Sequence, residues 1–162
     1  ATIQTGFEQQ IVPALDNPEA RSAAATIGHL LRHVALRIEC EGQILLDDIG
    51  RLEALLARIA AWFDDVGAGD AGAGDTGAIR KVLGQGLPAG TWPSLTLLGE
   101  RALALRGALV AAQEALHLLA PGHGDDPGYA SLRQAIRDYI TAQLADEGRL
   151  IAPAFKGKGP RR

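Results

Sequence analysis

The polar residues whose spacing could support chemistry form a row near the start of the chain. His33, Arg37 and Glu41 follow one another at intervals of four residues, so a helix places them along one face. Projected along a helix, the row climbs from the outer face towards the apolar one, which brings Glu41 close to the core side. A carboxylate beside an arginine in a helical interface must be paired or must change its protonation state.

Three interpretations of this row stay open. The first is an Arg37–Glu41 ion pair that fixes the register between helices. The second is a polar pocket that binds a small ligand, in which Arg37 would hold a carboxylate or phosphate and Glu41 would tune that contact. Glu147 and His33 would line the same pocket. The third is a catalytic acid or base, although no nucleophile or second acid is placed with it; Asp48 lies near the same edge of the helix.

Two histidine patterns could bind a metal. Glu114 and His117 match the Glu-x-x-His spacing of di-iron bundles, but such a site needs the motif on two helices and further glutamates from two others. Only one copy occurs, and both side chains project away from the apolar stripe of their helix. His29 and His33 lie four residues apart but lack a third ligand. We therefore predict no metal site, no catalytic residue set and no cofactor.

One long helix must position the polar row. Residues 18–63 carry apolar side chains at alternating steps of three and four: Ile27, Leu31, Val34, Ile38, Leu45, Ile49, Leu52, Leu56, Ile59 and Phe63. Asn17 can cap this helix, and Pro18 suits its first position. At ~1.5 Å per residue this helix would be about 69 Å long, which is much longer than a globule of this size is wide. The helix therefore either breaks near Gly42 or Gly50, or stays continuous and extends beyond the bundle. The stripe resumes beyond Gly42, which favours a continuous helix, straight or bent there.

The remaining elements follow from local signals. Ile3, Phe7 and Ile11 lie four apart and predict a short helix over residues 2–12. Residues 64–93 form a Gly-rich linker and loop that lacks the Gly-Lys-Ser/Thr ending of a phosphate-binding loop. We expect a short helical segment over 78–83 within it, and Trp92 packed against the bundle.

Two more helices complete the chain. Ser94 caps a helix over residues 94–120, which we expect Pro121 to end. The last helix covers residues 127–151 and stops at Pro153. The basic segment 153–162 has no periodic pattern and is expected to be a flexible tail.

The composition fits these elements. Apolar residues make up 47% of the 162 residues but aromatic residues only 4%, so alanine and aliphatic side chains must build the core. No stretch has the alternation of a strand. We predict one domain with an all-α fold, an antiparallel helical bundle built on one long N-terminal helix.

Charge and cysteine content restrict the class of protein. A net charge of −3 argues against binding to nucleic acid, which normally requires a basic surface. The single cysteine, Cys40, cannot form an internal disulfide, which favours a reducing compartment. No apolar run approaches the ~20 residues needed to cross a bilayer. We expect a cytoplasmic protein that acts neither on nucleic acid nor in a membrane.

The stretch RSAAATIGHLLRHVALRIECEGQILLDDI, preceded by FEQQIVPAL, resembles a family of small all-helical bacterial proteins of unknown function. Members of that family look like companions of aminoglycoside-phosphotransferase-like kinases and acyl-CoA dehydrogenases. The resemblance covers about the first 60 residues and rests on an Arg-Ala-Ala run with helical hydrophobic residues. This chain carries no kinase or dehydrogenase motif, so the resemblance implies an accessory role.

These observations predict an interaction or accessory module that self-associates. The apolar stripe of the long helix is larger than two shorter helices can cover, and exposed apolar stripes mark partner surfaces. Its partner would be a second copy of the chain or another protein. The alternative is a helical bundle that binds a small ligand in a polar pocket around Arg37 and Glu41. A carboxylate-based enzyme is the third hypothesis.

Overall fold

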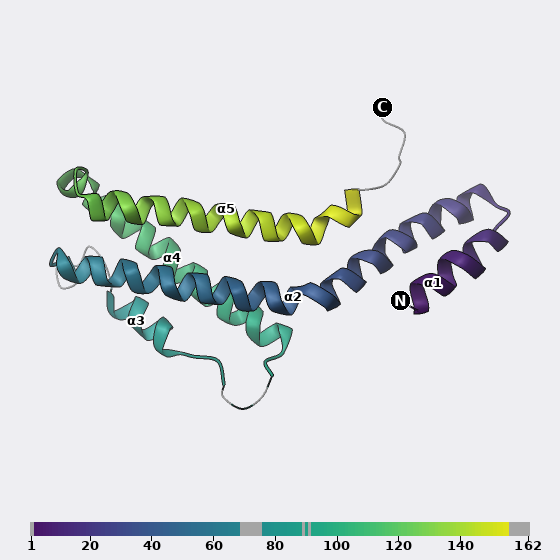
Figure 1. Cartoon of the computed structure of the whole chain (residues 1–162), viewed down its shortest axis with the longest axis horizontal. Helices are drawn as coiled ribbons and strands as arrows, with labels where there is room; N and C mark the ends of the chain where they lie inside the picture. Colours follow the sequence, from purple (N-terminus) through teal and green to yellow (C-terminus); the bar gives the residue numbers. More distant parts are fainter. Residues whose placement is uncertain (1, 69–75, 89, 91, 156–162) are drawn as a thin grey trace. The chain divides into compact units, whose positions relative to one another are not determined.

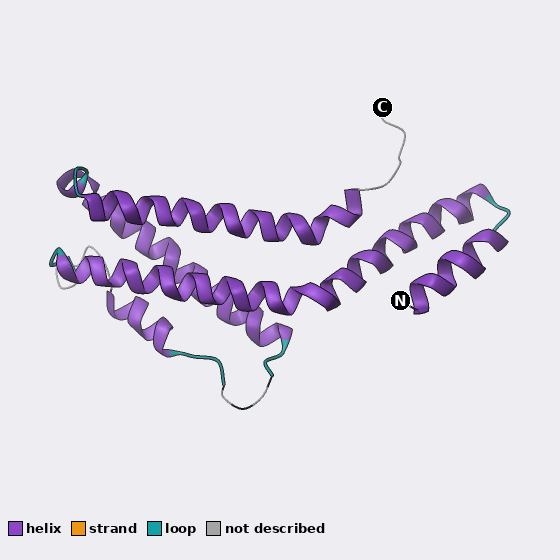
Figure 2. Cartoon of the chain, in the orientation of Figure 1, coloured by secondary structure: helices purple, strands orange, loops and turns teal. Residues whose placement is uncertain are grey.

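The computed structural model describes residues 2–68, 76–88, 90 and 92–155, and all regular secondary structure in these ranges is helical (Figure 2). The all-α prediction is therefore confirmed. The elements, labelled in Figure 1, are α1 (Thr2–Gly6), a π-helix (Phe7–Ile11), a 3-10 turn (Val12–Ala14), α2 (Pro18–Asp65), α3 (Thr76–Gly84), α4 (Leu95–His123) and α5 (Pro127–Phe155).

The chain divides into two compact units. Residues 1–42 and 144–162 form the first unit, and residues 43–143 form the second, so α2 and α5 each contribute to both. The predicted linker residues 69–75 and most of the predicted basic tail, 156–162, lie outside the described residues.

The long helix α2 is a single helical element from Pro18 to Asp65, with no break at Gly42 or Gly50. The backbone N–H of Glu19 donates to Oδ1 of Asn17 over 2.8 Å, as the predicted N-cap requires. Gly67 ends the helix because its φ of 67° places it in the left-handed region. The N–H of Ala68 then donates to the carbonyl of Phe63, which completes a Schellman-type cap.

The core of the second unit lies between the C-terminal part of α2, α3, α4 and the first part of α5. Its largest fully buried side chains are Leu52, Leu56, Ile59, Phe63, Leu98, Leu105 and Leu116. At one end, Trp62 packs edge-on against His123 and close to Tyr129, and its Nε1 donates to Asp126 over 2.8 Å. The ends of α2 and α4 thus meet the start of α5, which runs antiparallel to both (Figure 1).

Several local predictions need correction. Helix α4 continues through Pro121 to His123, and α5 continues through Pro153 to Phe155. Each proline lies in the last turn, where its missing N–H removes a single i→i−4 bond. Trp92 does not pack against the bundle, because its side chain is 81% exposed. Leu87 contacts the core from this loop instead.

In the first unit, the N-terminal segment packs beside the start of α2 (Figure 1). The Phe7 ring lies 3.9 Å from where a Cβ on Gly28 would be, and Ala24, one turn away, is buried. Arg32 pairs with Glu8 across the same contact at 3.2 Å. Because Ala24 and Gly28 are small, the N-terminal segment can approach α2 closely. The side of α2 that carries these two residues is therefore covered.

Candidate functional site

The polar row predicted from the sequence lies on α2. An Nη of Arg37 lies 3.8 Å from a carboxylate oxygen of Glu41, and their side chains are 51% and 25% exposed. Because both residues belong to one helix, this contact by itself does not link two helices. His33 is half-buried, and its Nδ1 has no hydrogen-bond partner among the described residues. Glu147 lies on α5 and is exposed. A shared pocket for these four residues stays a prediction.

The apolar stripe of α2 differs sharply between its two halves. From Ile49 to Phe63 its five side chains are at most 5% exposed. In the first half Ile27, Val34 and Ile38 are 45%, 51% and 77% exposed, and Leu30 beside them is 59% exposed. We call these four residues the exposed α2 face: Ile27, Leu30, Val34 and Ile38. At 100° per residue the centre of this face lies about a quarter turn from Ala24 and Gly28, the side that the N-terminal segment covers, so the face adjoins that side and is left open.

A buried polar cluster joins three helices of the second unit. Asp48 of α2 is only 2% exposed, and an Nη of Arg106 on α4 donates to its Oδ2 over 2.8 Å. Tyr139 of α5 is buried beside them. Asp48 could be singled out from its place near the apolar edge of the helix, whereas Arg106 could not, because no periodic pattern links residues 58 positions apart.

The chemistry of this cluster is that of a structural ion pair. Burial raises the pKa of Tyr139, and Arg106 offsets this effect only in part, so the hydroxyl stays neutral over a wider pH range. Asp48 Oδ1 and the Tyr139 hydroxyl are buried without hydrogen-bond partners among the described residues. A buried pair that bridges helices costs desolvation energy and specifies their packing.

Arg101 of α4, which unlike Arg106 is itself buried, also bridges helices. Arg101 of α4 donates to Glu53 of α2 and to the carbonyl of Val82 on α3, both over 2.6 Å. It therefore ties three helices together through one guanidinium group. Both of its Nη atoms donate to protein acceptors, so it is placed to hold the fold together.

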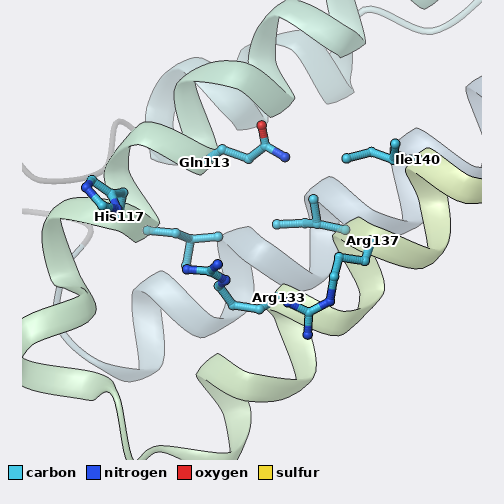
Figure 3. Close-up of a pocket in the computed structure, with 7 residues that line it drawn as sticks. Gln113, His117, Arg133, Arg137 and Ile140 are labelled. Carbon is cyan, nitrogen blue, oxygen red and sulfur yellow. The ribbon is translucent and has the colours of Figure 1, made fainter.

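A pocket with a different character lies between α4 and α5, with a volume of about 350 Å³. Its lining includes Gln113 and His117 of α4 and Arg133, Arg137 and Ile140 of α5, which are labelled in Figure 3. Buried Leu116 and Ile136 complete its lining. None of these residues was predicted as a site residue. They come from two different helices, and the sequence does not show which faces of those helices pack together.

Two further properties of the described residues bear on metal binding and on membranes. Within the described ranges, no three His, Cys, Asp or Glu side chains gather closely enough to hold a metal ion. Helix α4 is long and apolar enough to cross a membrane by length and composition, contrary to the expectation from the sequence. A core helix of a folded domain passes the same test, and 33% of this stretch is buried inside the fold.

Comparisons with protein-family models, with curated proteins and with solved structures find no match to this chain. The function must therefore be inferred from the geometry of each unit.

Proposed function

We propose that this chain is a helical interaction module that self-associates through the exposed α2 face. The observation that carries the proposal is the exposure of four aliphatic side chains, 45–77% each, on one side of a helix whose apolar stripe is buried in the other half. Aliphatic side chains gathered on one face lose unfavourable contact with water when a partner covers them.

The spacing of the face favours a second copy of the chain as the partner. Steps of three and four residues are the geometry of a seam between two helices, and two copies present the same seam to each other. In a two-fold interface, residue i of one copy meets residue j of the other and the reverse.

The charged edge of the face is self-complementary in the same sense. At 100° per residue, Glu41 falls within the face and Arg37 on its border. Arg37 is half exposed and its contact with Glu41 within the helix is long, 3.8 Å. In an antiparallel pairing of two α2 helices, Arg37 of one copy would approach Glu41 of the other. The two residues predicted as a site would then select the partner.

The test is the mass of the protein in solution across a concentration series, measured by light scattering and sedimentation. We expect a dimer that Ile38→Asp converts to a monomer, because the substitution places a carboxylate in the apolar seam. Leu103→Asp is the matched control, since Leu103 is 70% exposed on α4 and lies outside the face. A monomer at high micromolar concentration, or equal loss of the dimer in both variants, would overturn the proposal.

The accessory role implied by the family resemblance agrees with an interaction module. The ligand-binding alternative around Arg37 and Glu41 has one observation in its favour, the unpartnered Nδ1 of His33 one helical turn away. The enzyme hypothesis has less support, because the buried carboxylate Asp48 is occupied by Arg106.

A further inference from the structure

The pocket between α4 and α5 combines polar walls with an apolar floor. Gln113 and His117 lie four residues apart on α4, and Arg133 and Arg137 lie four apart on α5, so each helix contributes one pair from successive turns (Figure 3). Leu116 and Ile136 are almost fully buried beneath them. Ile140 extends the apolar surface at one end of the pocket.

The two arginines of this pocket are not neutralised by the protein. Arg133 makes a 3.3 Å hydrogen bond to the hydroxyl of Tyr129 and lies 5.9 Å from the centre of its ring. Arg137 donates to the amide oxygen of Gln134 over 2.9 and 3.2 Å. Among the described residues, neither guanidinium forms an ion pair with a carboxylate.

Other arginines of the chain behave differently. Within the described part of the chain, at least six arginines pair with an acidic side chain: Arg32, Arg37, Arg80, Arg101, Arg106 and Arg149. In a protein with a net charge of −3, two unpaired guanidinium groups at one pocket form a local positive site. The neutral bonds to Tyr129 and Gln134 hold the side chains in place and leave further N–H donors free for a ligand.

Acidic groups near the pocket do not cancel this charge. Glu114 lines a neighbouring hollow on the outer side of α4, together with Gln113 and His117. Asp138 accepts a hydrogen bond from Gln134 and lines a different pocket, between α2 and α5. The lining of the α4–α5 pocket itself contains no carboxylate.

We propose that this pocket binds a small amphiphilic anion, a carboxylate or phosphate monoester with an aliphatic chain. Guanidinium groups hold both head groups through paired N–H···O bonds, which an ammonium group cannot match. Gln113 supplies a further hydrogen-bond donor to the head group of the ligand. The aliphatic chain of the ligand covers Leu116, Ile136 and Ile140. The volume lies at the lower end of the roughly 300–1,000 Å³ typical of small-molecule sites.

The experiment is calorimetric titration of the full chain with octanoate and with octyl phosphate. We expect saturable binding of at least one of them, and weaker binding of octanol and of octyltrimethylammonium, which keep the chain but lack the negative charge. Equal binding of octyltrimethylammonium would overturn the proposal. It would also be overturned if neither free anion binds and the protein does not bind vesicles that carry a phosphate monoester lipid.

Variants locate the site. Arg133→Gln combined with Arg137→Gln should weaken binding at least about tenfold, because charge-assisted hydrogen bonds are lost. Arg149→Gln is the matched control, since it also removes an exposed arginine but lies outside the pocket. Circular dichroism checks that each variant is folded. Equal weakening by the control would show non-specific attraction and would overturn the site.

A second arm distinguishes the source of the anion. Vesicles with and without phosphatidic acid present the same phosphate monoester on a lipid. Binding to the charged vesicles alone, lost in the double variant, would identify a membrane lipid as the ligand and support the same chemistry. The double variant should keep the dimer mass, so failure here and failure of the proposed self-association are separate outcomes.

Discussion

The two halves of α2 have similar apolar patterns and opposite surroundings. In residues 43–65 the stripe is buried against α4 and α5, and Leu52, Leu56 and Ile59 have no exposed surface. In residues 18–42 the small residues Ala24 and Gly28 are covered by the N-terminal segment, while Ile38 is 77% exposed. The comparison teaches that periodicity identifies the apolar side of a helix and leaves open what covers it.

The largest expected difference in the free energy of unfolding comes from truncating one aliphatic side chain to alanine in each half of α2. Leu56→Ala should lower the free energy of unfolding by about 2–5 kcal/mol, because it removes buried contacts and leaves a cavity. Ile38→Ala should change it by no more than about 0.5 kcal/mol at concentrations where the chain is monomeric. Urea denaturation at low protein concentration measures both. Equal losses would show that the exposed α2 face is covered by its own chain.

Removing one acid from each half gives the next largest contrast. Asp48→Ala removes the buried carboxylate that accepts from the partly exposed Arg106 and should destabilise the fold by about 1.5–3 kcal/mol. Glu41→Ala removes a long contact to the half-exposed Arg37 and should cost about 0–1 kcal/mol. Thermal unfolding in dilute solution compares the two variants. A larger loss for Glu41→Ala would place that residue in a buried network.

The smallest expected effect is a change in the pH dependence of stability, caused by Asp126, which bonds Trp62 near the C-terminal end of α2. Hydrogen bonds from the Trp62 indole and then the Gly128 backbone lower the pKa of Asp126 below its usual value of about 4. A depressed carboxylate pKa stabilises the fold above the unfolded-state pKa, and this contribution is lost as pH falls through the folded-state pKa. Asp126→Asn should therefore lose less stability than the natural chain between pH 5 and pH 3. Melting curves over this range are the measurement, and parallel pH profiles would contradict the assignment.

Local features of the fold could be predicted because neighbouring residues decide them. Asn17 and Ser94 cap their helices as expected, since a side-chain acceptor needs only the next turn of backbone. The α3 segment was also anticipated, with the structure extending it to Thr76–Gly84. Helix ends at Pro121 and Pro153 were misjudged, because one lost hydrogen bond does not outweigh the remainder of the turn.

Candidate site residues could be found from the sequence only where they share one helix. Arg37 and Glu41 are such a pair, and their contact is present. Arg106 with Asp48, and Arg133 with His117, come from different helices, and nothing in the spacing of the chain predicts that they meet. Trp62 and Trp92 show the same limit, since only the packing of α2 against α4 and α5 buries the first.

Local sequence patterns specify that the chain is helical, where its long helix begins, and which side of that helix is apolar. These properties follow from capping and from a repeat of three and four residues, which act over one or two turns. Only the packing of the helices specifies which part of the stripe is buried and which arginines pair with a carboxylate. It also places Arg133 and Arg137, which form no such pair, at the α4–α5 pocket. These outcomes depend on contacts between residues far apart in the chain, whose free energy appears only when the helices pack.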